Sequence, residues 1–464
     1  MLSTKNSQRR DLTQGGVVEQ LVRLTSPVII GVFAVLSISI ADTYFIGQLG
    51  TNELAAIGFV YPVAFILMSI AIGLGAGSAS VIARAIGKQA QDEVKRLSTY
   101  SIILAFIGIS IISLLGYLTI RPMFSLMGAE GEVLDIIERY MRIWYPGLML
   151  LVMPMVANSI IRATGDTFSP SMIMVTAAVV NIVLDPIFIF GWGIIPAMNV
   201  EGAAWASVIA RAVTLIAAFS IIVFREKLII FQFESVSLLL QDWWRVLTIA
   251  VPAAIGNMVN PLGIAIITAI LASLGAETVA GYGVATRIES FAMIPMLALS
   301  AAIGPFVGQN FGAQQMQRIR HSLQACAIFC IGWSAFIAVL FVFVRVPVNA
   351  LFTDNTQALL VSNQYLLIVP LSFAGYGIIT IVAAAYNAIG RPMIGLGYYL
   401  LRTAGLYVPL VALLVPAQQL DGLYWSAVVA NLVAGVFTYF HGQHLLCKKI
   451  TSKELNLSTS EAAC

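Results

Sequence analysis

Two aspartates stand in stretches that are otherwise almost entirely apolar. Asp42 lies in VLSISIADTYFIGQLG, and Asp185 lies in NIVLDPIFIFGWG, four residues after Asn181. This spacing places Asn181 and Asp185 on one face of a helix. Pro186 follows directly and lacks an N–H, so it leaves the backbone carbonyl of Ile182 without its helical partner. One carboxylate, one amide and one free carbonyl form a polar group that can bind a cation.

The composition places these acids in a membrane. The chain has 464 residues, of which 59% are hydrophobic and 10% are charged, whereas soluble domains are roughly 45–50% apolar. An ionisable side chain at the centre of a bilayer costs about 2.5–3.5 kcal/mol, so each one needs a partner or a function. Burial and a neighbouring carboxylate both disfavour the charged form. We therefore expect Asp42 and Asp185, if they are neighbours, to take up and share a proton more readily than free aspartates.

Apolar runs of about 20 residues or more, each long enough to cross a hydrocarbon core of roughly 30 Å, recur along the whole chain. The first run is too long for the core of a cleaved signal sequence, so we interpret it as a retained helix. We expect twelve transmembrane helices, near residues 20–46, 53–80, 97–120, 134–161, 167–190, 200–225, 243–273, 277–306, 320–345, 357–389, 393–416 and 420–446.

Most of the 25 Lys and Arg residues lie in alternate segments between these runs, including Arg84, Arg318 and Lys448. The opposite segments hold only Arg121 and Arg345. Because positive residues concentrate on the cytoplasmic side, we expect a multi-pass protein of a bacterial-type inner (plasma) membrane with both termini in the cytoplasm. The net charge of +3 follows from this topology and does not indicate binding to nucleic acid.

The sequence repeats itself after 225 positions. Pro27 in SPVIIG then falls on Pro252 in VPAAIG, and QLGTNELAAIG meets SLGAETVAGYG; after small length changes, EGAAWAS at 201–207 meets DGLYWSA at 421–427. The offset spans an even number of crossings, so we expect an all-α integral membrane protein of two six-helix bundles. A pseudo-twofold axis along the membrane normal would relate these bundles around a central cavity. The predicted domains are an N-lobe at residues 1–225, a cytoplasmic linker at 226–242, and a C-lobe with a cytoplasmic tail at 243–464.

The acidic pattern is not shared by the two halves. The repeat position of Asp42 is Ile267, and GYYLLRTAGLYVPLVALL, the second-half counterpart of the Asp185 stretch, has no carboxylate. Glu289 lies two residues from Arg287, a spacing at which side chains on a helix do not face each other, so we expect both to pair with other helices. Structural explanations remain open: Asp42 at a hydrated helix end, and Asp185 as a packing contact.

Several classes of protein lack support in the sequence. There is no HExxH, no GxSxG with a suitably placed His and acid, and no Walker A sequence, which argues against a zinc enzyme, an intramembrane protease and a P-loop pump. We therefore expect no enzyme activity and no cofactor. If the protein pumps, the energy comes from an ion gradient.

Five stretches, ADTYFIGQLG, LAAIGFVYP, RATGDTFSP, NIVLDPIFIFGWG and EGAAWAS, resemble the multidrug and toxic compound extrusion (MATE) family. The acidic pattern of the first half is similar to its DNA-damage-inducible-protein-F (DinF) branch. The resemblance implies an antiporter that exports amphipathic, often cationic, compounds in exchange for inward H⁺ or Na⁺. Its partners would then be small amphipathic drugs and membrane lipid, and we expect a monomer.

The DinF-like pattern also implies a cation-coupling site. It consists of an aspartate of the first helix, an asparagine and an aspartate of the fifth, a tyrosine of the fourth and a small hydroxyl residue of the sixth, which fall here on Asp42, Asn181, Asp185, Tyr140 and Ser207. The proline that accompanies a bend of the first helix in some members falls on Pro27. Sodium-coupled NorM-like members carry important acids in the C-lobe, where Glu289 and Arg287 are the remaining candidates for a secondary site.

Our main hypothesis is H⁺-coupled drug antiport, in which protonation of the aspartates rearranges the first helix at Pro27. The oxygens of Asp42, Asn181 and Asp185 also suit Na⁺, so a sodium-coupled antiporter stays open. Two further readings are a flippase for lipid-linked precursors from the same superfamily and a scaffold or receptor that transports nothing. The sequence does not identify the substrate, the stoichiometry, the resting conformation or the residues of the drug site.

Overall fold

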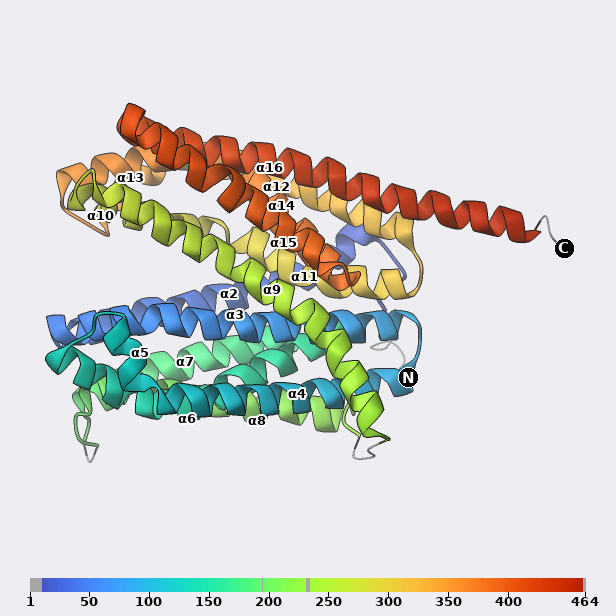
Figure 1. Ribbon diagram of the computed structural model, residues 1–464, viewed down its shortest axis with the longest axis horizontal. Coiled ribbons are helices and arrows are strands. Elements are labelled where there is room, and N and C mark those ends of the chain that lie inside the picture. The colour runs from blue at the N-terminus through green and yellow to red at the C-terminus, as the bar shows by residue number, and fades with distance from the viewer. Residues whose placement is uncertain (1–10, 194, 231–233, 462–464) are drawn as a thin grey trace. The chain divides into compact units, whose positions relative to one another are not determined.

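The computed structural model describes residues 11–193, 195–230 and 234–461, and helices make up most of these ranges (Figure 1). The first half forms α2 (Val17–Gly47), α3 (Thr51–Gly87), α4 (Gln91–Leu118), α5 (Ile120–Leu126), α6 (Gly131–Ala163), α7 (Phe168–Phe190), α8 (Asn199–Ser220) and the π-helical turn η1 (Ile221–Arg225). The second half forms α9 (Val236–Ala272), α10 (Ala276–Ala292), α11 (Ile294–Gly312), α12 (Met316–Ala350), α13 (Thr356–Ile368), η2 (Val369–Ser372), α14 (Phe373–Ala388), α15 (Pro392–Leu400), η3 (Leu401–Tyr407) and α16 (Val408–Glu461).

Each of the twelve predicted apolar runs is helical. The described residues contain 11 continuous helical spans that are long and apolar enough to cross a membrane. The number is lower than twelve because the last span, Pro392–His444, holds two predicted helices. Gln419, at φ 51° and ψ −125°, breaks the helical geometry between them. The prediction of an all-helical membrane protein is confirmed.

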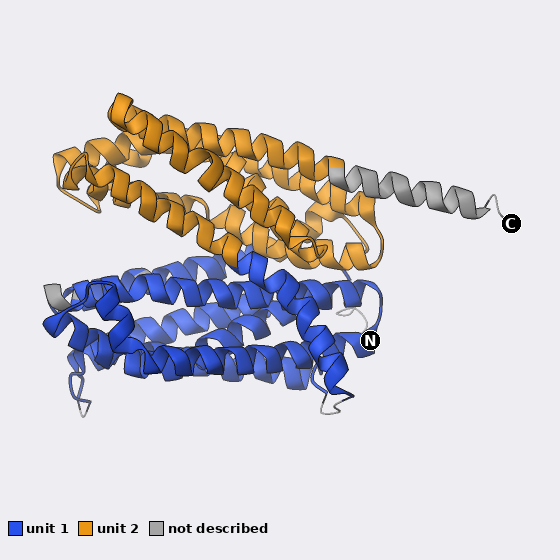
Figure 2. Cartoon of the chain, viewed as in Figure 1, with its two compact units in different colours: residues 1–11, 26–254 blue, residues 12–25, 255–464 orange. Residues whose placement is uncertain are grey.

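The chain divides into two compact units, shown in Figure 2. Unit 1 comprises residues 1–11 and 26–254, and unit 2 comprises residues 12–25 and 255–464. Helices α2 and α9 therefore each begin in one unit and end in the other, and Pro27 and Pro252 stand close to these crossings. The lobes predicted from the repeat describe sequence similarity, whereas the units describe contacts, so the lobe boundaries stay a prediction. Residues 231–233 of the predicted linker lie outside the described residues.

Two glycines bring the helices of unit 1 close together. A Cβ on Gly202 would lie 2.3 Å from the carbonyl oxygen of Phe188, so the start of α8 touches the backbone at the end of α7. A Cβ on Gly31 would lie 3.2 Å from the Cα of Ser171, so α2 also packs closely on α7. At Gly31 the nearest atom of α7 is the Sδ of Met174, at 3.1 Å from the Cβ position. The glycines therefore bring α7 close to both neighbouring helices.

The repeat is visible in the packing of unit 2. Gly422 occupies the position of Gly202 in the alignment of DGLYWSA with EGAAWAS, and a Cβ there would lie 2.5 Å from the carbonyl oxygen of Leu414. Both halves therefore use a glycine to seat one helix against the backbone of the preceding helix. Only glycine permits so short an approach.

Polar contacts within each unit hold the segment that precedes α2 and the second turn of α9. In unit 2, Arg318 donates a hydrogen bond from Nη1 to the carbonyl oxygen of Gly15 at 2.7 Å. Asn310 donates from Nδ2 to the carbonyl oxygen of Leu12 at 3.0 Å. In unit 1, the Nε of Arg96 lies 2.9 Å from the Oδ2 of Asp242, whose side chain is 1% exposed. These contacts fix where each long helix begins.

Candidate functional site

The carboxyl groups of Asp42 on α2 and Asp185 on α7 meet inside unit 1. They lie within hydrogen-bonding range of each other, and Asp185 is completely buried. Two carboxyl groups at this range can bond only when one of them holds a proton, because two carboxylates repel each other. The contact joins two residues that are distant in the sequence, and the close packing of α2 on α7 makes it possible.

Asn181 connects the aspartates with α8. Its Nδ2 lies 3.5 Å from the Oδ1 of Asp185, one helical turn further along α7. The same Nδ2 lies 3.4 Å from the Oγ of Ser207. Both distances are long for hydrogen bonds, so the amide bridges the two helices without holding either side chain tightly.

Three oxygens of this group are buried without a hydrogen-bond partner among the described residues: Oδ1 of Asp42, Oδ2 of Asp185 and Oδ1 of Asn181. Buried acceptors without partners are rare, since each one loses its hydrogen bonds to water. Their common location leaves the cluster able to accept a proton or a small cation.

Tyr140, on α6, lies within electrostatic range of Asp42 and Asp185. The structure therefore brings together all five residues that the resemblance places in a coupling site, with Tyr140 at its edge. Their function in coupling stays a prediction. The proposed hinge residue Pro27 lies inside the continuous helix α2, and a bend there likewise stays a prediction.

Arg211 on α8 belongs to this cluster and was missed as a site residue by the sequence reasoning. Its guanidinium lies within electrostatic range of Asp42 and Tyr140. It stands 5.6 Å from the ring centroid of Trp144, and its Nη1 is buried without a hydrogen-bond partner among the described residues. The available signal was its spacing, because a residue four positions after Ser207 lies on the same helix face.

A hollow of about 280 Å³ lies beside the aspartate pair. It is lined by Ser37, Ile40, Ala41, Tyr44, Phe45 and Ile182. Ala41 and Ile182 are the sequence neighbours of Asp42 and Asn181. None of the five predicted coupling residues lines this hollow.

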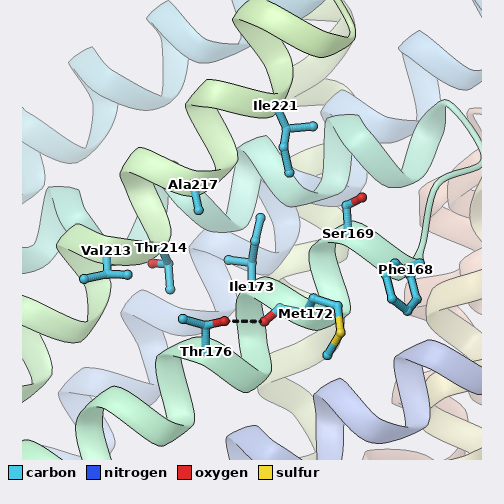
Figure 3. A pocket seen from close by; sticks show the side chains of 9 residues that line it. All are labelled: Phe168, Ser169, Met172, Ile173, Thr176, Val213, Thr214, Ala217 and Ile221. Atoms are coloured by element: carbon cyan, nitrogen blue, oxygen red, sulfur yellow. Dashed lines mark hydrogen bonds between the residues drawn. The ribbon is translucent and has the colours of Figure 1, made fainter.

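A second hollow, of about 220 Å³, lies between α7 and α8 near their far ends (Figure 3). It is lined by Phe168, Ser169, Met172, Ile173, Thr176, Val213, Thr214, Ala217 and Ile221. At the edge of this hollow, the carboxylate of Asp166 accepts a hydrogen bond from the Oγ of Ser169 at 2.7 Å. The same carboxylate forms an ion pair with Arg225. None of the five predicted coupling residues lines this hollow, and its lining is mostly apolar, so we assign it to packing against lipid.

The predicted secondary candidates of the second half do not pair with each other. The Oε2 of Glu289 accepts a hydrogen bond from the hydroxyl of Tyr365 on α13 at 2.8 Å. Arg287 is exposed on the same helix. Their separation agrees with the helical spacing, which prevents residues two apart from facing each other.

Long apolar helices that surround a buried pair of acids, with a second polar cluster around Glu289, define a helical membrane transporter. The family model described as MatE matches residues 27–187 and again residues 252–413. The chain belongs to this family, the MATE transporters, and is not an enzyme. The two matched stretches begin at Pro27 and Pro252, the pair that the repeat aligns.

The names of related proteins indicate different substrates. The chain is 37% identical over 437 residues to a protein of Shewanella oneidensis named FAD transporter, covering 94% of this chain and 97% of that one. It is 24% identical to the multidrug export protein MepA of Staphylococcus aureus, covering 92% and 94% of the two chains. Among solved structures, the Vibrio cholerae MATE transporter VcmN in the bent form is 31% identical, with a TM-score of 0.88 and coverage of 93% and 97%.

Proposed function

We propose that this transporter exports a flavin dinucleotide and is driven by protons that bind at the Asp42–Asp185 pair. The carbon skeleton of such a substrate is aromatic and its phosphates are anionic. The single observation that carries the coupling is the close approach of the two aspartates, because two neighbouring carboxyl groups away from water favour binding of a proton.

The surroundings of the pair favour H⁺ over Na⁺. Arg211 already supplies a fixed positive charge within range of Asp42. When the carboxylates lose the shared proton, this guanidinium compensates part of the new negative charge. A sodium ion would have to bind beside it and would be repelled. The Na⁺-coupled alternative, with Asp42, Asn181 and Asp185 as ligands, uses the three unpartnered oxygens and predicts the opposite ion dependence.

Relatedness supports the flavin substrate. Identity to the Shewanella oneidensis FAD transporter is 37% over nearly the full length of both chains, whereas identity to the multidrug export protein of Staphylococcus aureus is 24%. The export of amphipathic cations, our hypothesis from the sequence, is the second candidate. It is favoured by the acidic cluster, which can attract a cationic drug as well as a proton.

Purified protein in proteoliposomes separates these candidates. The vesicles are loaded with FAD or with ethidium, and efflux is followed by fluorescence under an imposed pH gradient or, with pH clamped, an imposed Na⁺ gradient. We expect FAD efflux that depends on the pH gradient. Efflux of ethidium alone supports the drug exporter, efflux driven by Na⁺ alone overturns the proton coupling, and no gradient-dependent flux of either overturns transport of these compounds.

The remaining parts of the proposal rest on the resemblance to the MATE family. The first-half location of the acids supports placement in the DinF-like branch, and the charge asymmetry of the loops supports both termini in the cytoplasm. We propose that Tyr140 and Ser207 exchange hydrogen bonds with the pair as it titrates and that α2 bends near Pro27. We further propose a monomer as the functional form.

A further inference from the structure

A second polar cluster lies in unit 2, around a buried arginine. Arg402 lies in η3, and its side chain is 5% exposed. Its Nε donates to the Oδ1 of Asn431 at 2.8 Å, and its Nη1 donates to the Oδ1 of Asn260 at 2.6 Å. The guanidinium stands 4.5 Å from the ring centroid of Tyr376 and 5.2 Å from that of Tyr407. We call these five residues the Arg402 cluster.

The positive charge of Arg402 is not paired within the cluster. Its hydrogen-bond acceptors are neutral amides and, at 3.5 Å, the hydroxyl of Thr403. In the described part of the chain no carboxylate forms an ion pair with it. Glu289 lies within electrostatic range, but its Oε2 accepts from Tyr365. A guanidinium enclosed by neutral groups is costly in a membrane. Such residues are therefore rare and usually have a function.

One edge of the guanidinium is free. The hydrogen bonds of Arg402 use Nε and Nη1, and Nη2 has no partner among the described residues. Nη2 is also not one of the fully enclosed atoms that lack partners, although the side chain as a whole is only 5% exposed. The two amides and two rings thus hold the arginine in place while a donor edge stays available.

The repeat shows how the two halves differ in charge. Extending the alignment of EGAAWAS with DGLYWSA by four residues places Asn431 at the position of Arg211. In unit 1 the arginine lies within electrostatic range of one acid, Asp42, whereas in unit 2 Arg402 contacts this asparagine instead. Unit 1 has the groups to hold a cation, and unit 2 has a cation with a free donor edge.

We propose that the Arg402 cluster binds the anionic group of the exported compound, a phosphate attached to an aromatic ring system. The planar guanidinium matches the oxygens of a phosphate, and the faces of Tyr376 and Tyr407 suit an adjacent flat ring. This inference rests on the proposed flavin substrate and adds where its charge is recognised. The alternative is that Arg402 only joins η3 to α9 and α16.

Equilibrium binding in detergent tests this site. FAD and uncharged riboflavin are titrated into purified protein, with quenching of flavin fluorescence as the readout. Loss of a charge-assisted hydrogen bond costs about 10–100-fold in affinity. We expect Arg402→Gln to weaken FAD binding by about this factor and to leave riboflavin binding unchanged. Arg345→Gln, at another arginine of unit 2 that donates to backbone carbonyl oxygens, should match the wild type for both ligands.

The possible binding results distinguish the proposed substrate from the proposed Arg402 site. No FAD binding by the wild type overturns the proposed substrate, whereas equal FAD affinity in wild type and Arg402→Gln overturns the Arg402 site alone. Equal loss of FAD and riboflavin binding indicates a purely structural arginine and also overturns it. Should Arg402→Gln not fold, Arg402→Lys keeps the charge and Tyr376→Leu keeps all hydrogen bonds of Arg402. Arg402→Lys should weaken FAD binding selectively, and Tyr376→Leu should weaken the binding of both ligands because both contain the flat ring. Unchanged FAD binding in both variants contradicts the proposal.

Discussion

Asp42 on α2 and Asp185 on α7 come from different helices, and their carboxyl groups lie within hydrogen-bonding range of each other inside unit 1. Neither aspartate alone can link the two helices. A proton stabilises the contact and its loss converts attraction into repulsion. The pair therefore couples a change of protonation to the distance between two helices.

Asp42→Asn should abolish proton-driven transport. The amide keeps the shape of the side chain but does not titrate, so the pair no longer exchanges a proton with the outside. We expect FAD efflux under a pH gradient to fall below about a tenth of the wild-type rate. Asp354→Asn, at an exposed acid of the other unit, is the control and should transport normally. Wild-type flux in Asp42→Asn would exclude this aspartate from coupling.

Arg211→Met should change the ion preference of the site. Methionine removes the fixed positive charge beside Asp42 while filling much of the same volume. We expect proton-driven flux to decrease and a Na⁺ gradient with pH clamped to begin to drive transport, because the three unpartnered oxygens no longer face a competing cation. The ratio of the two fluxes in proteoliposomes is the measurement. An unchanged ratio contradicts the role of Arg211.

Gly202→Ala should destabilise unit 1. The added Cβ would lie 2.3 Å from the carbonyl oxygen of Phe188, so α8 must move away from α7, which costs about 1–3 kcal/mol. Gly422→Ala should have a similar effect on unit 2. Thermal unfolding in detergent measures both. Gly283→Ala, a helical glycine with open space around its Cβ position, should be neutral, and equal Tm values for all three variants would contradict the packing argument.

Arg318→Ala should release the segment before α2. Its Nη1 and Nη2 donate to the carbonyl oxygens of Gly15, Leu12 and Gln14, and bonds of this charge-assisted kind contribute about 1.5–3 kcal/mol. We expect the amides of residues 12–20 to exchange with deuterium about 10–100 times faster. Arg320→Ala, at an exposed arginine on the same helix, provides the comparison. Equal exchange in both variants would show that other contacts fix the segment.

Much of the fold follows from local patterns. Apolar runs of membrane-spanning length predict the helices, and the internal repeat, after small length changes, predicts that Gly202 and Gly422 have corresponding places. The break at Gln419 has no glycine or proline at that residue, yet Pro416 and the polar residues around it divide the two apolar runs.

The candidate site is only partly local. The shared face of Asn181 and Asp185 follows from helical periodicity, whereas the contact with Asp42 depends on how α2 packs on α7 and was available only through the family resemblance. Arg211 was not assigned to the coupling site because a lone arginine in an apolar helix does not reveal which neighbour it faces. The bond between Arg402 and Asn431 likewise joins segments whose meeting no local pattern predicts.

The division into units has a consequence for expressing the chain as two separate fragments. A cut of the chain between residues 230 and 234 would give two fragments. The first carries residues 12–25 of unit 2, and the second carries residues 234–254 of unit 1. Each fragment thus completes a unit that belongs mainly to the other. Expressed separately, neither has all the residues of either unit, but expressed together as a split protein they have the means to recognise each other.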